Sequence, residues 1–182
     1  MQRSSRVDYD AIAELYDSTP HRKKSADPEL IAFLGARGSS ARLTLLDIAC
    51  GTGNQQIANR DLARFVAFDG SLGMLRQERR KMPDIAWVHG DSAALPLASG
   101  RFDFISCQYA FHHFRDKAGM LREAFRVVRR GGTVSTRTPR TGAASGFSRP
   151  TAAIPAGPQS RSARLVQRKC GLYPLSLSVR PG

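Results

Sequence analysis

Three carboxylates and a pair of glycines stand at spacings that could form one binding site. Asp47 and the turn Gly51-Thr52-Gly53 follow an apolar run in "LLDIACGTGNQ", and Asp69 and Asp91 close two further short apolar runs. Glycines there permit unusual backbone angles and let a ligand lie against the main chain. A strand-end carboxylate can accept hydrogen bonds from both hydroxyls of a ribose, or from an exocyclic amine of a purine. The pattern therefore indicates a nucleoside site.

The glycine pattern argues against a pyrophosphate ligand. The fingerprint G-x-G-x-x-G would need a third glycine at position 56, where the chain has Gln56. No G-x-x-x-x-G-K-[ST] loop occurs either. We therefore expect a nucleoside without a pyrophosphate.

Short apolar runs alternate with helical patterns along the chain, which predicts an α/β fold. Because parallel strands with right-handed crossovers place helices on both faces, we expect a Rossmann-like, doubly wound parallel sheet. In the helix after Asp69, Leu72 and Leu75 are expected inward and the charges outward. Strands are predicted at 42–50, 64–70, 84–91, 102–108 and 133–138, and helices at 8–18, 28–35 or 28–38, 55–63, 71–82 and 116–128.

Composition places limits on the class of protein. The 182 residues suit one domain, and 28 Lys plus Arg against 15 Asp plus Glu give a net charge of +13. Three cysteines without a C-x-x-C pair argue against a disulfide framework or a metal site, and they fit a reducing compartment. The N-terminus has acids where a signal peptide needs an apolar core, and no apolar run is long enough to cross a bilayer. We expect a cytoplasmic protein with no membrane partner.

The composition changes near residue 138. Residues 1–138 carry the alternating pattern, with the N-terminal helix at 8–18 and a core at 28–138, whereas residues 139–182 are rich in Pro, Gly, Ser, Ala and Arg and contain no acids. Such a composition buries too little apolar surface to offset the entropy of ordering it. We expect a basic, low-complexity and disordered tail at 139–182.

Four segments carry a resemblance to a known family. "LLDIACGTGNQ", "FVAFDGSLGML", "WVHGDSAALPLASGRFDFISCQYAFHHF" and "AFRVVRRGGTV" resemble the successive motifs of class I S-adenosylmethionine-dependent methyltransferases. They are most similar to the small-molecule, methyltransferase type 11 branch, which includes ubiquinone and menaquinone C-methyltransferases. The resemblance covers residue 8 to about residue 136. It implies S-adenosyl-L-methionine as cofactor and a small-molecule methyl acceptor.

The resemblance also implies a role for individual residues. Asp69 would hold the ribose, Gln108 would lie near the amino acid end or the methyl group, and Tyr9 and Tyr16 match aromatic positions in an N-terminal helix that often lids the site. Ala49 stands where many relatives have glycine. The implied cofactor-binding residues are Asp47, Ala49, Gly51 and Gly53 near the methionine part, Asp69 and Gly70 at the ribose, Asp91, Ser92 and Ala93 at the adenine, and Gln108 and Tyr16.

His112 and His113 follow the fourth predicted strand at the expected mouth of the site. One of them can act as a base or contact the acceptor, since histidine titrates near neutrality. Equally, one can be a partly buried residue that packs with Phe111 and Phe114. A metal site made of this pair and Asp116 is disfavoured, because adjacent residues rarely point to one ion.

The end of the chain departs from the family pattern. Relatives continue after the fifth strand with a helix and two further strands, whereas here the composition resembles a shifted reading frame or a truncation. We expect the C-terminal strands to be missing, which would leave an open sheet edge. Two alternatives therefore stay open: a catalytically inactive, truncated relative that binds the cofactor, and a nucleic-acid methyltransferase suggested by the charge. The second lacks the Asn/Asp-Pro-Pro-aromatic signature, because the chain reads "CQYAFHHF" there.

Overall fold

The computed structural model describes residues 7–19, 27–37, 43–138, 164–169 and 174–177. None of the helices in these ranges is long and apolar enough to cross a membrane. The elements in chain order are α1 (Tyr9–Ile12), η1 (Ala13–Ser18), α2 (Pro28–Arg37), β1 (Thr44–Ile48), α3 (Asn54–Asn59), β2 (Arg64–Asp69), α4 (Leu72–Lys81), β3 (Ala86–His89), β4 (Phe102–Gln108), η3 (Phe111–His113), α5 (Lys117–Val127), β5 (Val128–Thr138), β6 (Arg164–Lys169) and β7 (Pro174–Leu177).

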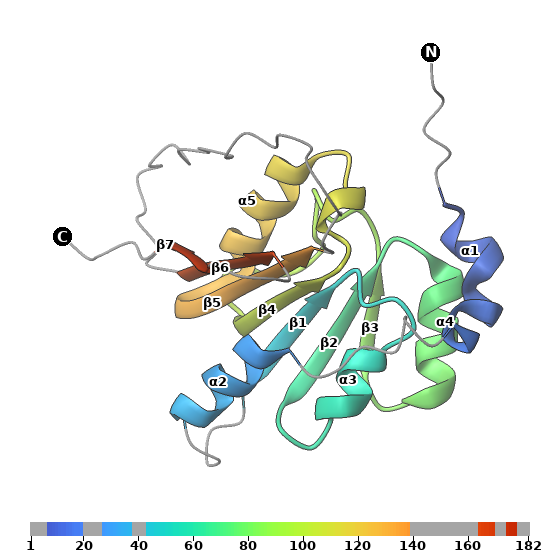
Figure 1. Cartoon of the computed structure of the whole chain (residues 1–182), viewed down its shortest axis with the longest axis horizontal. Helices are drawn as coiled ribbons and strands as arrows, with labels where there is room; N and C mark the ends of the chain where they lie inside the picture. The colour runs from blue at the N-terminus through green and yellow to red at the C-terminus, as the bar shows by residue number, and fades with distance from the viewer. Residues whose placement is uncertain (1–6, 20–26, 38–42, 139–163, 170–173, 178–182) are drawn as a thin grey trace.

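One sheet organises the described residues (Figure 1). Its strand order is β3-β2-β1-β4-β5-β6-β7, and neighbouring strands from β3 to β6 run parallel. The order reverses between β1 and β4, which is the switch point at which open α/β sheets bind ligands. The predicted Rossmann-like parallel sheet is confirmed.

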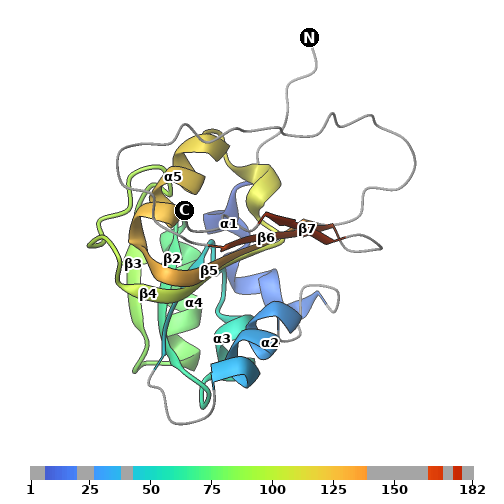
Figure 2. The same cartoon turned by 90° about the vertical axis from the view of Figure 1, so that its left-hand side faces the viewer.

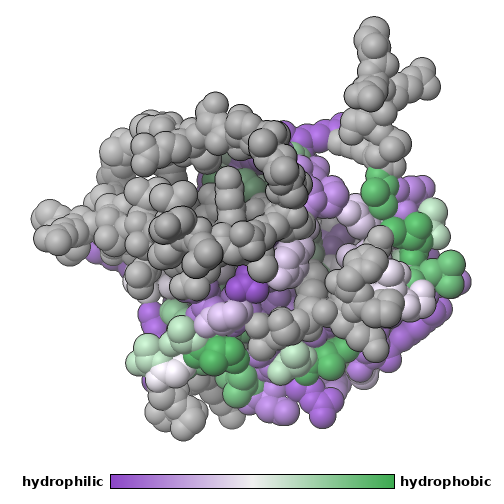
Figure 3. Space-filling model, viewed as in Figure 1, coloured by the Kyte–Doolittle hydropathy of each residue, from purple (hydrophilic) through white to green (hydrophobic). Residues whose placement is uncertain are grey.

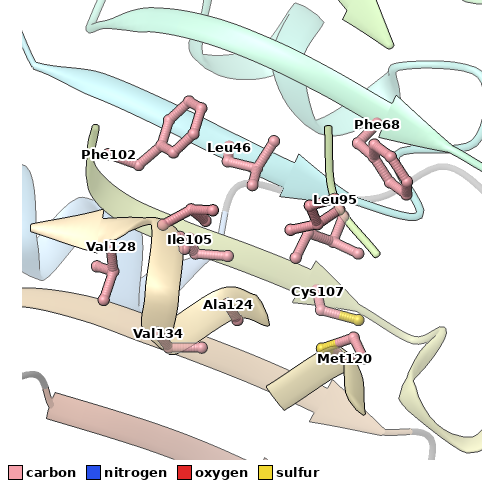
Figure 4. Close-up of a cluster of buried hydrophobic side chains, with 12 residues drawn as sticks. Leu46, Phe68, Leu95, Phe102, Ile105, Cys107, Met120, Ala124, Val128 and Val134 are labelled. Carbon is pink, nitrogen blue, oxygen red and sulfur yellow. The ribbon is translucent and has the colours of Figure 1, made fainter. Parts of the chain in front are cut away.

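Helices cover both faces of the sheet, as Figure 2 shows for α5 on one side and α2 and α3 on the other. On the α5 face, Leu46 of β1 packs with Ile105 of β4 and with Met120 of α5 (Figure 4). Ile48 of β1 belongs to the same cluster. On the other face, a second cluster joins α2 to β1, β2 and β4 through Leu30, Leu45, Phe65 and Phe104. Successive residues of a strand point to opposite faces, so a strand between two helical layers must be apolar on both sides.

The N-terminal segment, residues 8–18, differs from the single helix predicted there. It forms α1 and then a short 3₁₀ helix, η1. Asp8 caps α1, because its side chain accepts hydrogen bonds from the amides of Asp10 and Ala11. Only Ala13 of the segment is buried, so little apolar packing is present to select regular α-helical geometry.

The sheet continues after β5 with β6 and β7, so the expectation that the C-terminal strands are missing is wrong for these two strands. β6 pairs parallel with β5, and β7 pairs antiparallel with β6. An unpaired edge offers backbone donors and acceptors to any extended segment, and a short apolar pair such as Leu165-Val166 is hidden in the average composition of the tail. The rest of the tail that was predicted to be disordered, residues 139–163, 170–173 and 178–182, lies outside the described residues.

We predict that Phe104→Ala lowers the free energy of unfolding by about 3–5 kcal/mol, because it removes a fully buried ring that packs 5.1 Å from the ring of Phe33. Leu62→Ala is the control, since Leu62 is 50% exposed and should cost less than about 1 kcal/mol. Denaturant unfolding measures both. Equal losses in the two variants would contradict the assignment of Phe104 to the core.

Candidate functional site

The turn after β1 is tied to the end of β2 by one carboxylate. The Gly51 amide donates a hydrogen bond of 2.8 Å to Oδ2 of Asp69, and the Ser71 amide donates one of 2.9 Å to Oδ1. β1 and β2 run parallel, with Ile48 paired to Phe68, so both strands end at the same edge of the sheet. Asp69 therefore fixes the distance between the two loops that follow these strands.

The two glycines of the turn serve different purposes. Both have positive φ angles, +63° at Gly51 and +77° at Gly53. A Cβ at Gly51 would meet nothing within 4 Å, whereas a Cβ at Gly53 would lie 2.6 Å from Cγ of Glu78 and 2.7 Å from Cε of Met82. Gly51 thus leaves open space that a ligand can use, while Gly53 lets α4 pack against the turn.

A cavity of about 650 Å³ opens at the carboxyl ends of the strands, which is a size typical of small-molecule sites. It takes residues from the ends of β1, β2 and β3 and from the segment between η3 and α5. Its lining consists of Ala49, Phe68, Gly70, His89, Gly90, Asp91, Ser92, His113, Phe114, Arg115 and Asp116.

The structure brings several of the predicted site residues to this cavity. Ala49, Gly70, Asp91, Ser92 and His113 line it, and Asp69 lies between the lining residues Phe68 and Gly70. Asp91 is exposed, and its Oδ1 accepts a hydrogen bond of 2.9 Å from the amide of Ala93.

Two predicted site residues lie in the interior instead. Asp47 is 1% exposed and accepts a hydrogen bond of 2.6 Å from Nε2 of Gln56 in α3. Gln108, at the end of β4, is 3% exposed and donates from Nε2 to Oδ2 of Asp27 at 2.6 Å. Their side chains join the sheet to the helical layer that contains α2 and α3.

Asp27 is a residue that the sequence interpretation missed. It is 1% exposed, and it accepts hydrogen bonds from the Glu29 amide, the Gln108 carboxamide and the Ser135 hydroxyl. Burial raises the pKa of this carboxyl above its ordinary value. The signal in the sequence was its place directly before Pro28, where an Asp commonly caps a helix.

His113 lines the cavity and contacts Tyr9 of the N-terminal segment, and His112 lies next to it. The rings of His112 and His113 lie 3.8 Å apart, and Nε2 of His113 is 3.1 Å from the hydroxyl of Tyr9. Tyr16 is next to Tyr9, at a ring distance of 6.4 Å. Both histidines are exposed, and partial desolvation lowers the pKa of each below its ordinary value, which favours the neutral imidazole.

A buried acid and thiol lie beneath the turn. Glu78 of α4 is 1% exposed, its Oε2 accepts a hydrogen bond of 3.1 Å from Sγ of Cys50, and its Oε1 has no hydrogen-bond partner within the described ranges. Burial, together with the charges of Asp47 and Asp69, raises the pKa of Glu78 to about 7. Burial also raises the pKa of the Cys50 thiol well above its ordinary value, so this cysteine is a packing residue and not a nucleophile.

Comparison with known proteins assigns this arrangement to a family. The model of the family described as "Methyltransferase domain" matches residues 46–136, half of the chain. The chain belongs to this methyltransferase domain family. The matched span begins inside β1 and ends inside β5, so it contains the turn, Asp69, the cavity and the histidine pair.

Individual relatives are similar over a larger part of the chain. A demethylmenaquinone methyltransferase of Beutenbergia cavernae is 34% identical over 130 residues, which are 68% of this chain and 53% of that protein. A malonyl-[acyl-carrier protein] O-methyltransferase of Pseudescherichia vulneris is 34% identical over 142 residues, 78% of this chain and 55% of that protein. The chain thus spans about half the length of the curated relatives it matches.

A solved structure shows the same fold. A Haloferax volcanii protein, solved in a complex that contains the Trm112 methyltransferase activator, superposes with a TM-score of 0.59 and 25% identity. The match covers 72% of this chain and 60% of that one.

We predict that Ala49→Gly raises the free energy of unfolding by roughly 0.5–1 kcal/mol. Ala49 has a φ of +57°, where a Cβ is strained and glycine is not. Ala118→Gly in the exposed first turn of α5 is the matched control and should lose up to about 1 kcal/mol. Thermal or urea unfolding compares them, and a loss of stability in Ala49→Gly would contradict the strain.

We predict that Glu78→Gln changes how stability depends on pH. The folded-state pKa is about 7, above the ordinary 4.5, so unfolding releases a proton between these values and the stability of the wild type falls as pH rises through them. The loss is at most about 3 kcal/mol, and glutamine removes it. Urea unfolding of both proteins between about pH 5 and pH 8 measures the difference. Parallel curves for the two proteins would show that Glu78 does not titrate in this range.

Proposed function

We propose that the chain is an S-adenosyl-L-methionine-dependent methyltransferase that methylates a small-molecule acceptor. The observation that carries the proposal is the placement of Asp69, at the end of β2, against the glycine turn and beside a cavity of suitable size. The family match supports methyl transfer, and the relatives named for menaquinone and malonyl-carrier chemistry support an acceptor that is not a nucleic acid.

The residues present fit an adenosyl group. Asp69 would accept the two ribose hydroxyls, which is compatible with its backbone bonds because a carboxylate can accept about four hydrogen bonds. The exposed Asp91, together with Ser92 and Ala93, would meet the adenine, and Gly51 leaves room for the methionine part. When bound, the cofactor supplies a sulfonium methyl that is already a strong electrophile.

The remaining work of the protein is to orient the reactants and exclude water. His113 is the better placed of the two histidines to contact an acceptor or take a proton, because it lines the cavity, and its lowered pKa favours the neutral form that a base needs. In the interior, Asp47 and Gln108 would act by holding the strand ends in place. We expect Tyr9 and Tyr16 to cover the same side of the cavity as His113.

Calorimetric titration with S-adenosylmethionine, and with S-adenosylhomocysteine as an unreactive analogue, tests the proposal. We predict that the wild type binds both and that Asp69→Ala weakens binding at least about tenfold, since hydrogen bonds to a charged group are lost. Asp61→Ala is the control, because its carboxylate is 90% exposed in a surface ion pair with Arg60.

Because Asp69 also holds two backbone amides, Asp91→Ala provides a second variant whose carboxylate is exposed. Melting curves of each variant separate lost affinity from lost folding. Well-folded wild-type protein that binds neither ligand would reject the proposal, as would Asp69→Ala and Asp91→Ala variants that both bind like the wild type.

A further inference from the structure

We propose that Asp17 is a positioning residue for the glycine turn, and that docking of the N-terminal segment, residues 8–18, is thermodynamically coupled to cofactor affinity through it. The inference rests on the proposed function, since the coupled ligand is the cofactor. Asp17 need not touch that ligand, because its contacts are to the turn itself.

The contacts of Asp17 converge on Thr52, the residue between the two glycines. Oδ1 of Asp17 accepts hydrogen bonds from Oγ1 of Thr52 at 2.6 Å and from Nδ2 of Asn54 at 2.8 Å. Oδ2 forms an ion pair with Lys81, the last residue of α4, and Nζ of Lys81 also donates to the carbonyl oxygen of Thr52 at 2.8 Å. Thr52 is therefore held at both its hydroxyl and its carbonyl.

Asp17 is ionised in this arrangement. Burial raises its pKa, but the hydrogen bonds from Lys81, Thr52 and Asn54 outweigh burial and leave the pKa below its ordinary value. A charged acceptor that receives several donors forms the stronger class of hydrogen bond. The N-terminal segment thus meets the turn through a charge-assisted contact.

The turn needs such a support because of its composition. Gly51 and Gly53 both sit at positive φ, and glycine loses more backbone freedom on ordering than any other residue. Thr52, which is 1% exposed, carries the one side chain of the three. A contact that fixes Thr52 before a ligand arrives lowers the ordering cost of binding.

Polar contacts, more than apolar burial, dock the N-terminal segment. Leu15 is 72% exposed and Val7, just before the segment, is 50% exposed, and Figure 3 shows apolar surface over this part of the molecule. Besides Asp17, Asp10 attaches the segment to α4 by accepting hydrogen bonds from Oγ of Ser71 at 2.9 Å and from the Gly73 amide at 2.6 Å. Loss of either carboxylate should therefore release the segment.

Gly73 is an independent sign that this docking is built into the fold. A Cβ at Gly73 would lie 2.9 Å from Oδ1 of Asp10 and 3.1 Å from Cβ of Ala13. Glycine forms helices less well than alanine, so its presence in α4 is explained by the close approach of the N-terminal segment. Gly73→Ala should consequently displace the segment while favouring the helix.

Four variants and a control test the inference. Asp17→Ala removes the contact, Thr52→Val removes the hydroxyl at similar shape, Thr52→Ser keeps the hydroxyl, and Gly73→Ala displaces the segment without changing Asp17 or Thr52. Asp61→Ala removes a carboxylate from a surface ion pair elsewhere. Amide hydrogen exchange of residues 51–54 without ligand reports on the turn, and titration with S-adenosylhomocysteine reports affinity.

We expect amide exchange in the turn to be about fivefold faster or more, and cofactor affinity about fivefold weaker or more, in Asp17→Ala, Thr52→Val and Gly73→Ala. Thr52→Ser and Asp61→Ala should resemble the wild type. Because coupling is reciprocal, the cofactor should also slow exchange in residues 8–18 of the wild type.

Unchanged exchange of the turn in both Asp17→Ala and Gly73→Ala would overturn the inference, whether or not the cofactor binds. Faster exchange with unchanged affinity would overturn the coupling. A wild type that binds no cofactor would reject both the proposed function and the coupling. Because the exchange measurement needs no ligand, faster exchange of the turn in the variants would still show in that case that Asp17 positions the turn. A Thr52→Ser variant as weak as Thr52→Val would contradict the role of the hydroxyl.

Discussion

The Asp69 carboxylate accepts the Gly51 amide at 2.8 Å and the Ser71 amide at 2.9 Å, and it thereby holds the turn after β1 to the start of α4. The open space at Gly51, the cavity lined by Gly70 and Asp91, and the N-terminus of α4 all depend on that spacing. Because β1, β2 and β3 are parallel, their loops meet at one edge and a single carboxylate can link two of them.

The sequence was sufficient to predict that these residues follow neighbouring strands at one edge of the sheet. Asp69, Asp91 and the glycine turn each follow a short apolar run, and in a parallel sheet such positions must lie together whatever the details of packing. The sheet itself was predictable for a related reason, since β1 lies between two helical layers and its sequence, Thr44-Leu45-Leu46-Asp47-Ile48, is mostly apolar on both faces. Both predictions use only the residue types within a short stretch of sequence, and they do not depend on contacts between distant residues.

Contacts between residues distant in sequence could not be predicted in the same way. The charges of α4 were expected to face outward, yet Glu78 is buried, because the missing side chain of Gly53 lets that face of the helix approach the turn. Leu72 was expected to point inward, yet it is 38% exposed as the first residue of α4. The hydrogen bond from Gln108 to Asp27 joins residues 81 positions apart, and the sequence around neither residue predicts it. β6 could not be predicted from the sequence either, since pairing at the edge of a sheet depends more on the neighbouring strand, here β5, than on the composition of the added strand.

A structure of the chain with S-adenosylhomocysteine tests the central claim most directly. The account predicts the adenosyl group in the cavity, with both ribose hydroxyls within hydrogen-bond distance of the Asp69 carboxylate, the adenine beside Asp91, and the methionine part over Gly51. A ligand bound elsewhere on the molecule, or a ribose that makes no contact with Asp69, would contradict it.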